Sequence, residues 1–167
     1  MRAIKLLLGL ATFSIVTGAL AKVTVDYDET IDFGNYREYA WKNGTPASSP
    51  QVQSYIEQAI NEALQSGGLS QSTGAPDLYA VVHASMKREQ EKGEGWFGYS
   101  SATKKWGMQH DTIKFEVGTL LVDLVEAKSK ELVWRGLATK TLSKKPDNPE
   151  SLIAKAIKKM FKRFPPK

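Results

Sequence analysis

The 167-residue chain contains no cysteine and only two histidines, His83 and His110. The absence of cysteine excludes disulfide bonds, thiolate nucleophiles and cysteine-ligated zinc. No Gly-x-Ser-x-Gly segment is present to expose a catalytic serine. The acidic residues Asp26, Asp28, Glu29 and Asp32 do not have the spacing of a calcium loop. The sequence therefore predicts no enzyme activity, no cofactor and no metal site.

The first 21 residues have the pattern of a cleavable signal peptide. Arg2 and Lys5 precede an uncharged apolar run that ends in Ala19-Leu20-Ala21, with small residues where a signal peptidase cleaves. The run is shorter than the roughly 20 residues that cross a bilayer. We therefore expect cleavage after Ala21, no transmembrane anchor afterwards, and a periplasmic or secreted protein.

Residues 22–167 are expected to form a single domain, because 41% apolar and 25% charged residues suit an ordinary globular core.

Two segments have the period of amphipathic helices. In the first, over residues 52–64, Ser49 and Pro50 provide a start and Gly67-Gly68 an end. The second begins at Asn148-Pro149, and its solvent face is basic. The apolar stripes of the two helices consist of Val52, Tyr55, Ile56, Ala59, Ile60, Ala63 and Leu64, and of Ile153, Ala156, Ile157, Met160 and Phe164.

Alternation and β-branched residues predict strands at residues 23–28, 39–41, 78–86, 112–126 and 132–142. Because short turns join several of these strands, we expect an α+β fold in which two amphipathic helices pack on one face of an antiparallel sheet. Trp41 and Trp134 are expected in the core. Arg135 is expected to point outward and to pair with Asp123 or Glu126 across a hairpin.

Several stretches together resemble a bacterial envelope family. They are Val25 to Asp28 with Asp32-Phe33, Tyr36 to Trp41, Pro76 to Leu78, Gly118 to Gly136, and Phe164 to Pro166. The chain resembles domain of unknown function 4136, which implies an exported α+β protein and brings no catalytic residues with it. Many members of that family look like lipoproteins, whereas this chain has no lipid-attachment cysteine. Lys130 stands where the hairpin turn of the family usually has glycine, so a left-handed lysine or another turn type is expected.

Residues 87–111 interrupt the strand pattern with glycines, charges and aromatic residues, and we expect a flexible loop there. Aromatic side chains that are exposed in a polar loop need a partner to stack on. We therefore expect a non-enzymatic binding or envelope-interaction module that contacts an envelope protein or a glycan through this segment. The candidate binding residues are Trp96, Phe97, Tyr99, Lys104, Lys105 and Trp106.

Two other functions remain open from the sequence. The protein could carry a small apolar ligand between the helix at residues 52–64 and the sheet, or it could be a hydrolase that uses His83 or His110. The basic C-terminal region is interpreted as a solvated helix face, since export removes the protein from nucleic acid.

Overall fold

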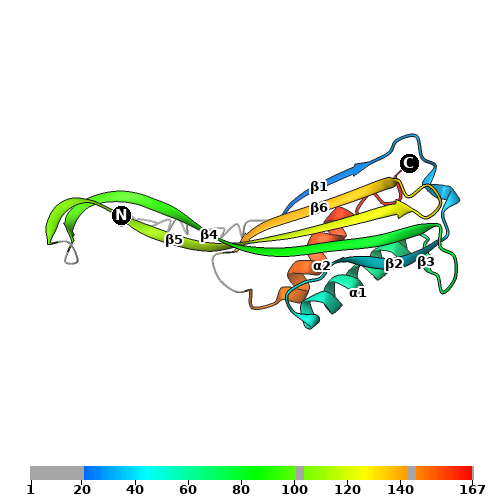
Figure 1. Cartoon of the computed structure of the whole chain (residues 1–167), viewed down its shortest axis with the longest axis horizontal. Helices are drawn as coiled ribbons and strands as arrows, with labels where there is room; N and C mark the ends of the chain where they lie inside the picture. The colour runs from blue at the N-terminus through cyan, green and yellow to red at the C-terminus, as the bar shows by residue number, and fades with distance from the viewer. Residues whose placement is uncertain (1–20, 101–103, 143–145, 167) are drawn as a thin grey trace, which may run out of the picture.

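The computed structural model describes residues 21–100, 104–142 and 146–166, so the expected signal peptide lies outside the described residues. The described chain forms one mixed sheet in the order β1-β6-β5-β4-β2-β3, with two helices (Figure 1). The elements are β1 (Lys22–Tyr27), a 3-10 turn (Phe33–Asn35), β2 (Glu38–Thr45), α1 (Pro50–Ser66), β3 (Ser70–Gln71), β4 (Leu78–Ser100), β5 (Lys105–Glu126), β6 (Leu132–Leu142) and α2 (Pro149–Met160).

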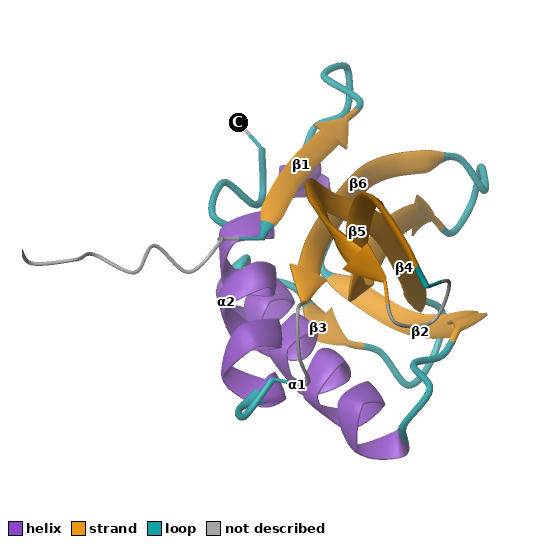
Figure 2. Ribbon diagram, turned by 90° about the vertical axis from the view of Figure 1, so that its left-hand side faces the viewer, coloured by secondary structure: helices purple, strands orange, loops and turns teal. Residues whose placement is uncertain are grey.

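Both helices form where their apolar stripes predict them. Pro50 begins α1, although the Ser49 hydroxyl makes no capping hydrogen bond; Gly68, with φ of 91°, follows its C-terminal cap. At the start of α2 the side chain of Asn148 accepts a hydrogen bond of 2.8 Å from the backbone N–H of Ser151. The two helices pack on the same face of the sheet (Figure 2).

The prediction of a purely antiparallel sheet is wrong. β2 pairs in parallel with β4 and with β3, whereas β4, β5, β6 and β1 pair antiparallel. The cause is the position of α1 between β2 and β4 in the chain. A helix that crosses over the sheet returns the chain to the end at which the first strand began, which makes the two strands parallel.

The core lies between the two helices and the sheet. The largest fully buried side chains come from every layer of this sandwich: Trp134, Tyr39, Ile60, Leu64, Leu78, Leu124, Ile157 and Val122. Trp134 packs on Phe161, with ring centroids 4.6 Å apart, which closes the C-terminal end of α2 against the sheet. The core position expected for Trp134 is confirmed, while Trp41 is half-buried at the edge of the core.

The segment expected to be a flexible loop, residues 87–111, is mostly paired strand. β4 continues to Ser100 and β5 begins at Lys105, and the two strands pair antiparallel from Leu78–Glu126 to Ser100–Lys105. The outer part of this ladder extends beyond the rest of the sheet as a two-stranded arm (Figure 1). The loop prediction failed because the backbone hydrogen bonds of an antiparallel ribbon form without apolar alternation, so glycines and charges in residues 87–111 do not exclude a strand.

The turn between β5 and β6 adopts the strained backbone that the sequence implied. Lys130 has φ of 66°, and its N–H donates to the carbonyl of Glu126 at 3.0 Å. The ladder closes beside it, where the N–H of Glu126 donates to Glu131 at 2.9 Å. Of the two alternatives that the missing glycine left open, the structure has the left-handed lysine.

Gly136 in β6 allows α2 to approach the sheet closely. A Cβ at this position would lie 2.6 Å from Cη2 of Trp134 and closer still to the side chain of Met160. We expect Gly136→Ala to lower the free energy of unfolding by about 1–3 kcal/mol, because overpacking forces the core apart. Urea denaturation measures the change. Gly118→Ala is the control, because its Cβ would meet Met86 at 3.5 Å and the carbonyl oxygen of Lys140 at 3.9 Å, both ordinary contacts. Equal losses in both variants would contradict the explanation.

Candidate functional site

The six candidate binding residues lie near the tip of the arm. Trp96, Phe97 and Tyr99 belong to the end of β4, Lys105 and Trp106 to the start of β5, and Lys104 to the turn between them, with φ of 54°. In the ladder Trp96 is opposite Gln109, Phe97 is opposite Met108, and Tyr99 is opposite Trp106. The backbone therefore brings together positions that the sequence identified only as a cluster.

The arm begins where its two neighbouring strands end. The last β2–β4 pair is Thr45–His83, and the last β5–β6 pair is Glu116–Leu142. Beyond these pairs β4 and β5 bond only to each other within the described sheet, and their register shifts between Lys92 and Gly95. A two-stranded ribbon without a third strand or a helix is only marginally stable in water, so the arm gains stability from any surface that covers it.

The sheet face opposite the helices carries an ion pair in its centre. One cross-strand row consists of Asp26, Arg135, Asp123, Val81 and Lys42. Arg135 donates from Nε and Nη2 to the two carboxylate oxygens of Asp123, both at 2.7 Å, and Asp123 is only 7% exposed. These hydrogen bonds raise the pKa of Arg135. The predicted cross-hairpin pair is confirmed with Asp123 as the partner.

The aromatic ring of Tyr79, one cross-strand row away from the Arg135–Asp123 pair, has two lysine ammonium groups near it. Nζ of Lys42 is 5.2 Å from the ring centroid of Tyr79, and Nζ of Lys130 is 4.9 Å from it. Cation–π contacts of this kind at exposed sites are individually weak. The two contacts place lysine ammonium groups next to an aromatic side chain of the open face.

The two histidines belong to different parts of the molecule. Nδ1 of His83 accepts a hydrogen bond of 3.1 Å from the N–H of Thr45, which ties β2 to β4. His110 is paired with Gly95 in the arm. His83 and Gly95 are separated by roughly 40 Å of extended strand at 3.3 Å per residue. The two imidazoles therefore belong to no common site within one molecule.

The acidic residues after β1 stabilise local turns. Asp28 accepts hydrogen bonds from the N–H and hydroxyl of Thr30 at 2.8 and 2.6 Å, and these bonds lower its pKa. Asp32 accepts from the N–H of Gly34 at 2.9 Å. Among the residues that the structure describes, no group of three or more His, Asp or Glu side chains is placed to hold a metal ion.

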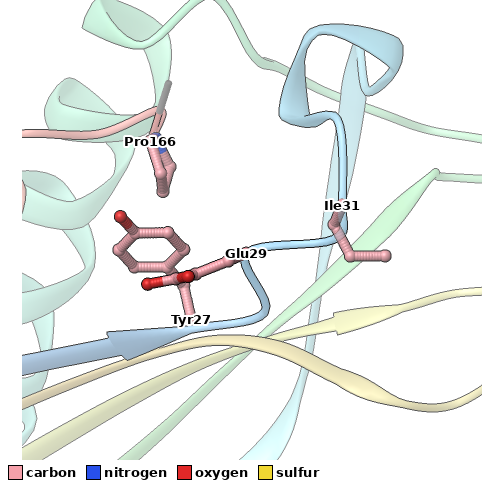
Figure 3. Close-up of a pocket in the computed structure, with 4 residues that line it drawn as sticks. All are labelled: Tyr27, Glu29, Ile31 and Pro166. Carbon is pink, nitrogen blue, oxygen red and sulfur yellow. The ribbon is translucent and has the colours of Figure 1, made fainter.

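A shallow cavity of about 370 Å³ lies beside these turns (Figure 3). It is lined by Tyr27 at the end of β1, by Glu29 and Ile31 in the following loop, and by Pro166 near the C-terminus. Tyr27 and Pro166 approach each other from opposite ends of the chain. Its polar lining consists of the phenol of Tyr27 and the carboxylate of Glu29, which do not by themselves define a catalytic constellation.

A second carboxylate cluster joins the starts of β2 and β4 to the β5–β6 turn. Oδ2 of Asp77 accepts from the N–H groups of Arg37 and Glu38 at 2.8 and 3.0 Å, which lowers the pKa of Asp77. Tyr36 donates to Glu126 at 3.2 Å, and burial together with that carboxylate raises the pKa of Tyr36 to about 12. Each of these groups is already bonded within the fold, so their role is structural.

The interface between α1 and the sheet, where a ligand-carrying pocket was considered, is filled by packed side chains. Ile56, Ile60 and Tyr39 are almost completely buried there. Asn61, which the sequence analysis did not single out, accepts from the hydroxyl of Tyr39 at 2.7 Å and from Nε1 of Trp41 at 3.1 Å. Asn61 gave no sequence signal, because a polar side chain beside the apolar stripe of a helix is ordinarily solvated.

The basic face of α2 is exposed, as the sequence predicted, at Lys155, Lys158 and Lys159. Its apolar face packs into the core through Ile157 and Met160. No helix in the described parts of the chain is both long and apolar enough to cross a membrane.

Comparison with known families identifies the chain. The model of the domain of unknown function DUF4136 matches residues 23–166, which is nearly the whole described chain. The chain therefore belongs to the DUF4136 family, as its sequence motifs implied. No curated protein matches it.

Solved structures share the fold at low sequence identity. A PDZ domain protein from Parabacteroides distasonis is 15% identical with a TM-score of 0.62; the match covers 89% of this chain but only 37% of that one. A PelC dodecamer from Paraburkholderia phytofirmans is 12% identical with a TM-score of 0.51, covering 84% of this chain and 94% of that one. At these identities the likeness establishes the fold alone.

The two arginine–carboxylate pairs of the β4–β5–β6 ladder allow a matched test. Arg135→Met leaves the carboxylate of Asp123 buried without its partner, so we expect a loss of about 2–4 kcal/mol in the free energy of unfolding. Arg88→Met removes a pair with Glu116 in which the arginine side chain is 88% exposed, and should cost less than about 1 kcal/mol. Chemical denaturation of both variants measures the difference. Because the Arg135 side chain is itself 45% exposed, the contrast between the two pairs lies in the burial of Asp123; similar losses would show that this burial has no special weight.

Proposed function

We propose that this DUF4136 protein is an exported, non-enzymatic interaction module whose β4–β5 arm binds a partner in the bacterial cell envelope. The observation that carries the proposal is the length of β4 and β5, which continue as a ribbon after β2 and β6 have ended. The extension lies beyond the strands that flank it in the body, and Glu89, Gln90 and Lys114 at its base are exposed. The extension is therefore available for contacts with another molecule.

The composition of the arm supports binding at its tip. Trp96, Phe97, Tyr99 and Trp106 place four aromatic residues within eleven positions, alongside Lys104 and Lys105. Tryptophan and tyrosine bring large contact area at low entropic cost, which is why such residues are common in binding surfaces. An envelope protein is the proposed partner, since the two free edges of a ribbon also offer backbone groups for strand addition. A glycan stacked on the aromatic rings is the alternative.

The other two functions have less support. The hydrolase would have to rely on one histidine, because His83 bonds to Thr45 and roughly 40 Å of strand separates it from the position paired with His110. The apolar carrier would need space at the α1 interface, where Ile56, Ile60 and Tyr39 pack together.

Export is the part of the proposal that concerns the first 21 residues. We expect protein recovered from the envelope fraction to begin at Lys22, because Ala19 and Ala21 satisfy the cleavage rule. Intact-mass spectrometry of the protein produced in its own host measures this directly. A product that retains Met1 and is recovered from the cytosol would contradict export and, with it, an envelope partner.

The arm itself is tested by removing it. Replacing residues 89–115 by an Asn-Gly turn joins Arg88 to Glu116, which face each other in the ladder, and should leave cooperative unfolding of the body in place because the removed segment extends beyond the rest of the sheet (Figure 1). We expect the shortened protein to lose the envelope partners that the full protein recovers in affinity purification. Recovery of the same partners by the shortened protein would reject the proposal.

Two sets of substitutions within the arm separate tip chemistry from general damage. Trp96→Ala combined with Trp106→Ala should abolish partner recovery. The matched control, Gln90→Ala with Lys114→Ala, alters a facing pair at the base of the arm and should leave recovery unchanged. A photoreactive residue at position 96 then identifies the captured molecule as protein or glycan.

A further inference from the structure

The two edges of the sheet differ in how well they are protected against pairing. On one side β3 has only two residues, and β2 next to it has a register shift between Lys42 and Thr45 and is followed by Pro46. Short strands, bulges and proline are the usual means by which proteins block an edge. On the other side β1 is a regular six-residue strand without proline or bulge. The edge of β1 is therefore the one suited to pairing with another strand.

The hydrogen-bond pattern shows which groups of β1 face outward. Just after the end of β1, the N–H of Asp28 donates to the carbonyl of Val133 in β6 at 3.0 Å. Because bonded and non-bonded residues alternate along an antiparallel pair, Thr24 and Asp26 also bond to β6. The N–H and C=O groups of Val23 and Val25 then point away from the sheet. Among the described residues, no backbone hydrogen bond to these outward groups is found.

The side chains of β1 are complementary to those of β1 in a second copy that runs antiparallel to it. Residues 22–26 read Lys-Val-Thr-Val-Asp, with opposite charges at the two ends and threonine in the centre. Val25 is 42% exposed although it is apolar. In an antiparallel self-pair centred on Thr24, lysine faces aspartate, valine faces valine, and threonine faces threonine. Each of these cross-strand pairs is of a stabilising type.

We propose that two copies of this protein associate through β1, pairing antiparallel with Thr24 on the two-fold axis, so that their sheets become one. The interface is isologous, as in most closed homodimers. It satisfies the outward backbone groups of Val23 and Val25 in both copies and covers Val25.

Charges beyond the strand favour the same arrangement. Nζ of Lys159 donates to the carbonyl of Ala21 at 3.2 Å, so a second cation lies at the Lys22 end of β1. Asp28 and Glu29 follow the other end and are exposed. Antiparallel pairing places the basic end of each strand beside the acidic end of the other, and the two-fold axis repeats this attraction.

The register centred on Thr24 is favoured over the neighbouring one centred on Val25. The backbone alternation allows both, because each pairs outward-facing residues with one another. A centre at Val25 would make Asp28 the partner of Lys22. Asp28, however, already accepts two hydrogen bonds from Thr30 and lies after the end of the strand. Asp26 lies within β1 and faces the required direction.

A single cysteine tests the pairing, because the chain has none of its own. Facing residues in a non-hydrogen-bonded pair have Cα atoms about 4.5 Å apart, within disulfide range. Thr24→Cys should therefore form a disulfide dimer several-fold faster under mild oxidation than Ser85→Cys, an exposed control in β4. Val25→Cys, which would face Val23 of the other copy, should behave like the control. Equal crosslinking of Thr24→Cys and Ser85→Cys, or faster crosslinking of Val25→Cys, would overturn the proposal.

Charge reversal provides a second test. Its outcome does not depend on the stability of either variant alone, because mixing the two variants should restore the dimer. Lys22→Asp alone and Asp26→Lys alone each place like charges opposite one another and should abolish the dimer in sedimentation velocity. An equimolar mixture of the two variants restores both opposite-charge pairs and should recover dimer. A wild-type protein that stays monomeric up to about 1 mM, or a mixture that stays monomeric, would overturn the proposal. The variant that lacks residues 89–115 should still dimerise, so this result is independent of partner binding by the arm.

Discussion

The antiparallel ladder between β4 and β5 is the interaction on which the rest of the structure depends. It runs from Leu78–Glu126 in the body to Ser100–Lys105 at the tip of the arm. In its first third, β2 and β6 flank the ladder and the helices cover one face, so Leu78, Val122 and Leu124 are buried. In its last part the same two strands have no neighbour in the described sheet. One hydrogen-bonded ribbon thus serves as the centre of the core and as the support of the arm.

The two faces of the sheet have different functions in the fold. The helix-covered face supplies the apolar core, in which Trp134, Phe161 and Ile157 meet. The open face is held by cross-strand polar contacts, above all the bidentate bond between Arg135 and Asp123. A buried carboxylate is costly without such a partner, so this pair restricts which register of β5 and β6 is stable. The open face gains specificity from this pair, while most of the hydrophobic stabilisation comes from the other side.

Much of the body could be predicted from the sequence, because its elements have the periodicity that a core imposes. The stripes of α1 and α2, the strand at Val23 and Val25, and a cross-hairpin partner for Arg135 follow from local pattern or cross-strand alternation. The left-handed Lys130 was one of two alternatives that the family resemblance raised. The parallel pairing of β2 with β4 was missed, although the strand–helix–strand order signals it. Residues 87–111 of the arm were missed because their glycines and charges resemble those of a loop, and backbone pairing alone leaves no mark on the side-chain pattern. The last stretch of the arm, with Ile113 and Phe115, was predicted as strand from its alternation. The self-complementary order of residues 22–26 acquires meaning only once β1 is known to be an edge.

The proposed dimer and the proposed arm contacts are compatible in geometry. Facing residues of an antiparallel pair point to the same side of a sheet, so the two-fold axis through Thr24 is perpendicular to the joined sheet. This axis keeps the helices of both copies on one face and reverses every strand direction. The two arms then project in opposite directions from a common sheet, too far apart to share one small partner. Such an assembly binds two partners at once, or two points on one extended partner. Its avidity exceeds the affinity of a single arm only if the distance between the two points on the partner matches the distance between the two arms.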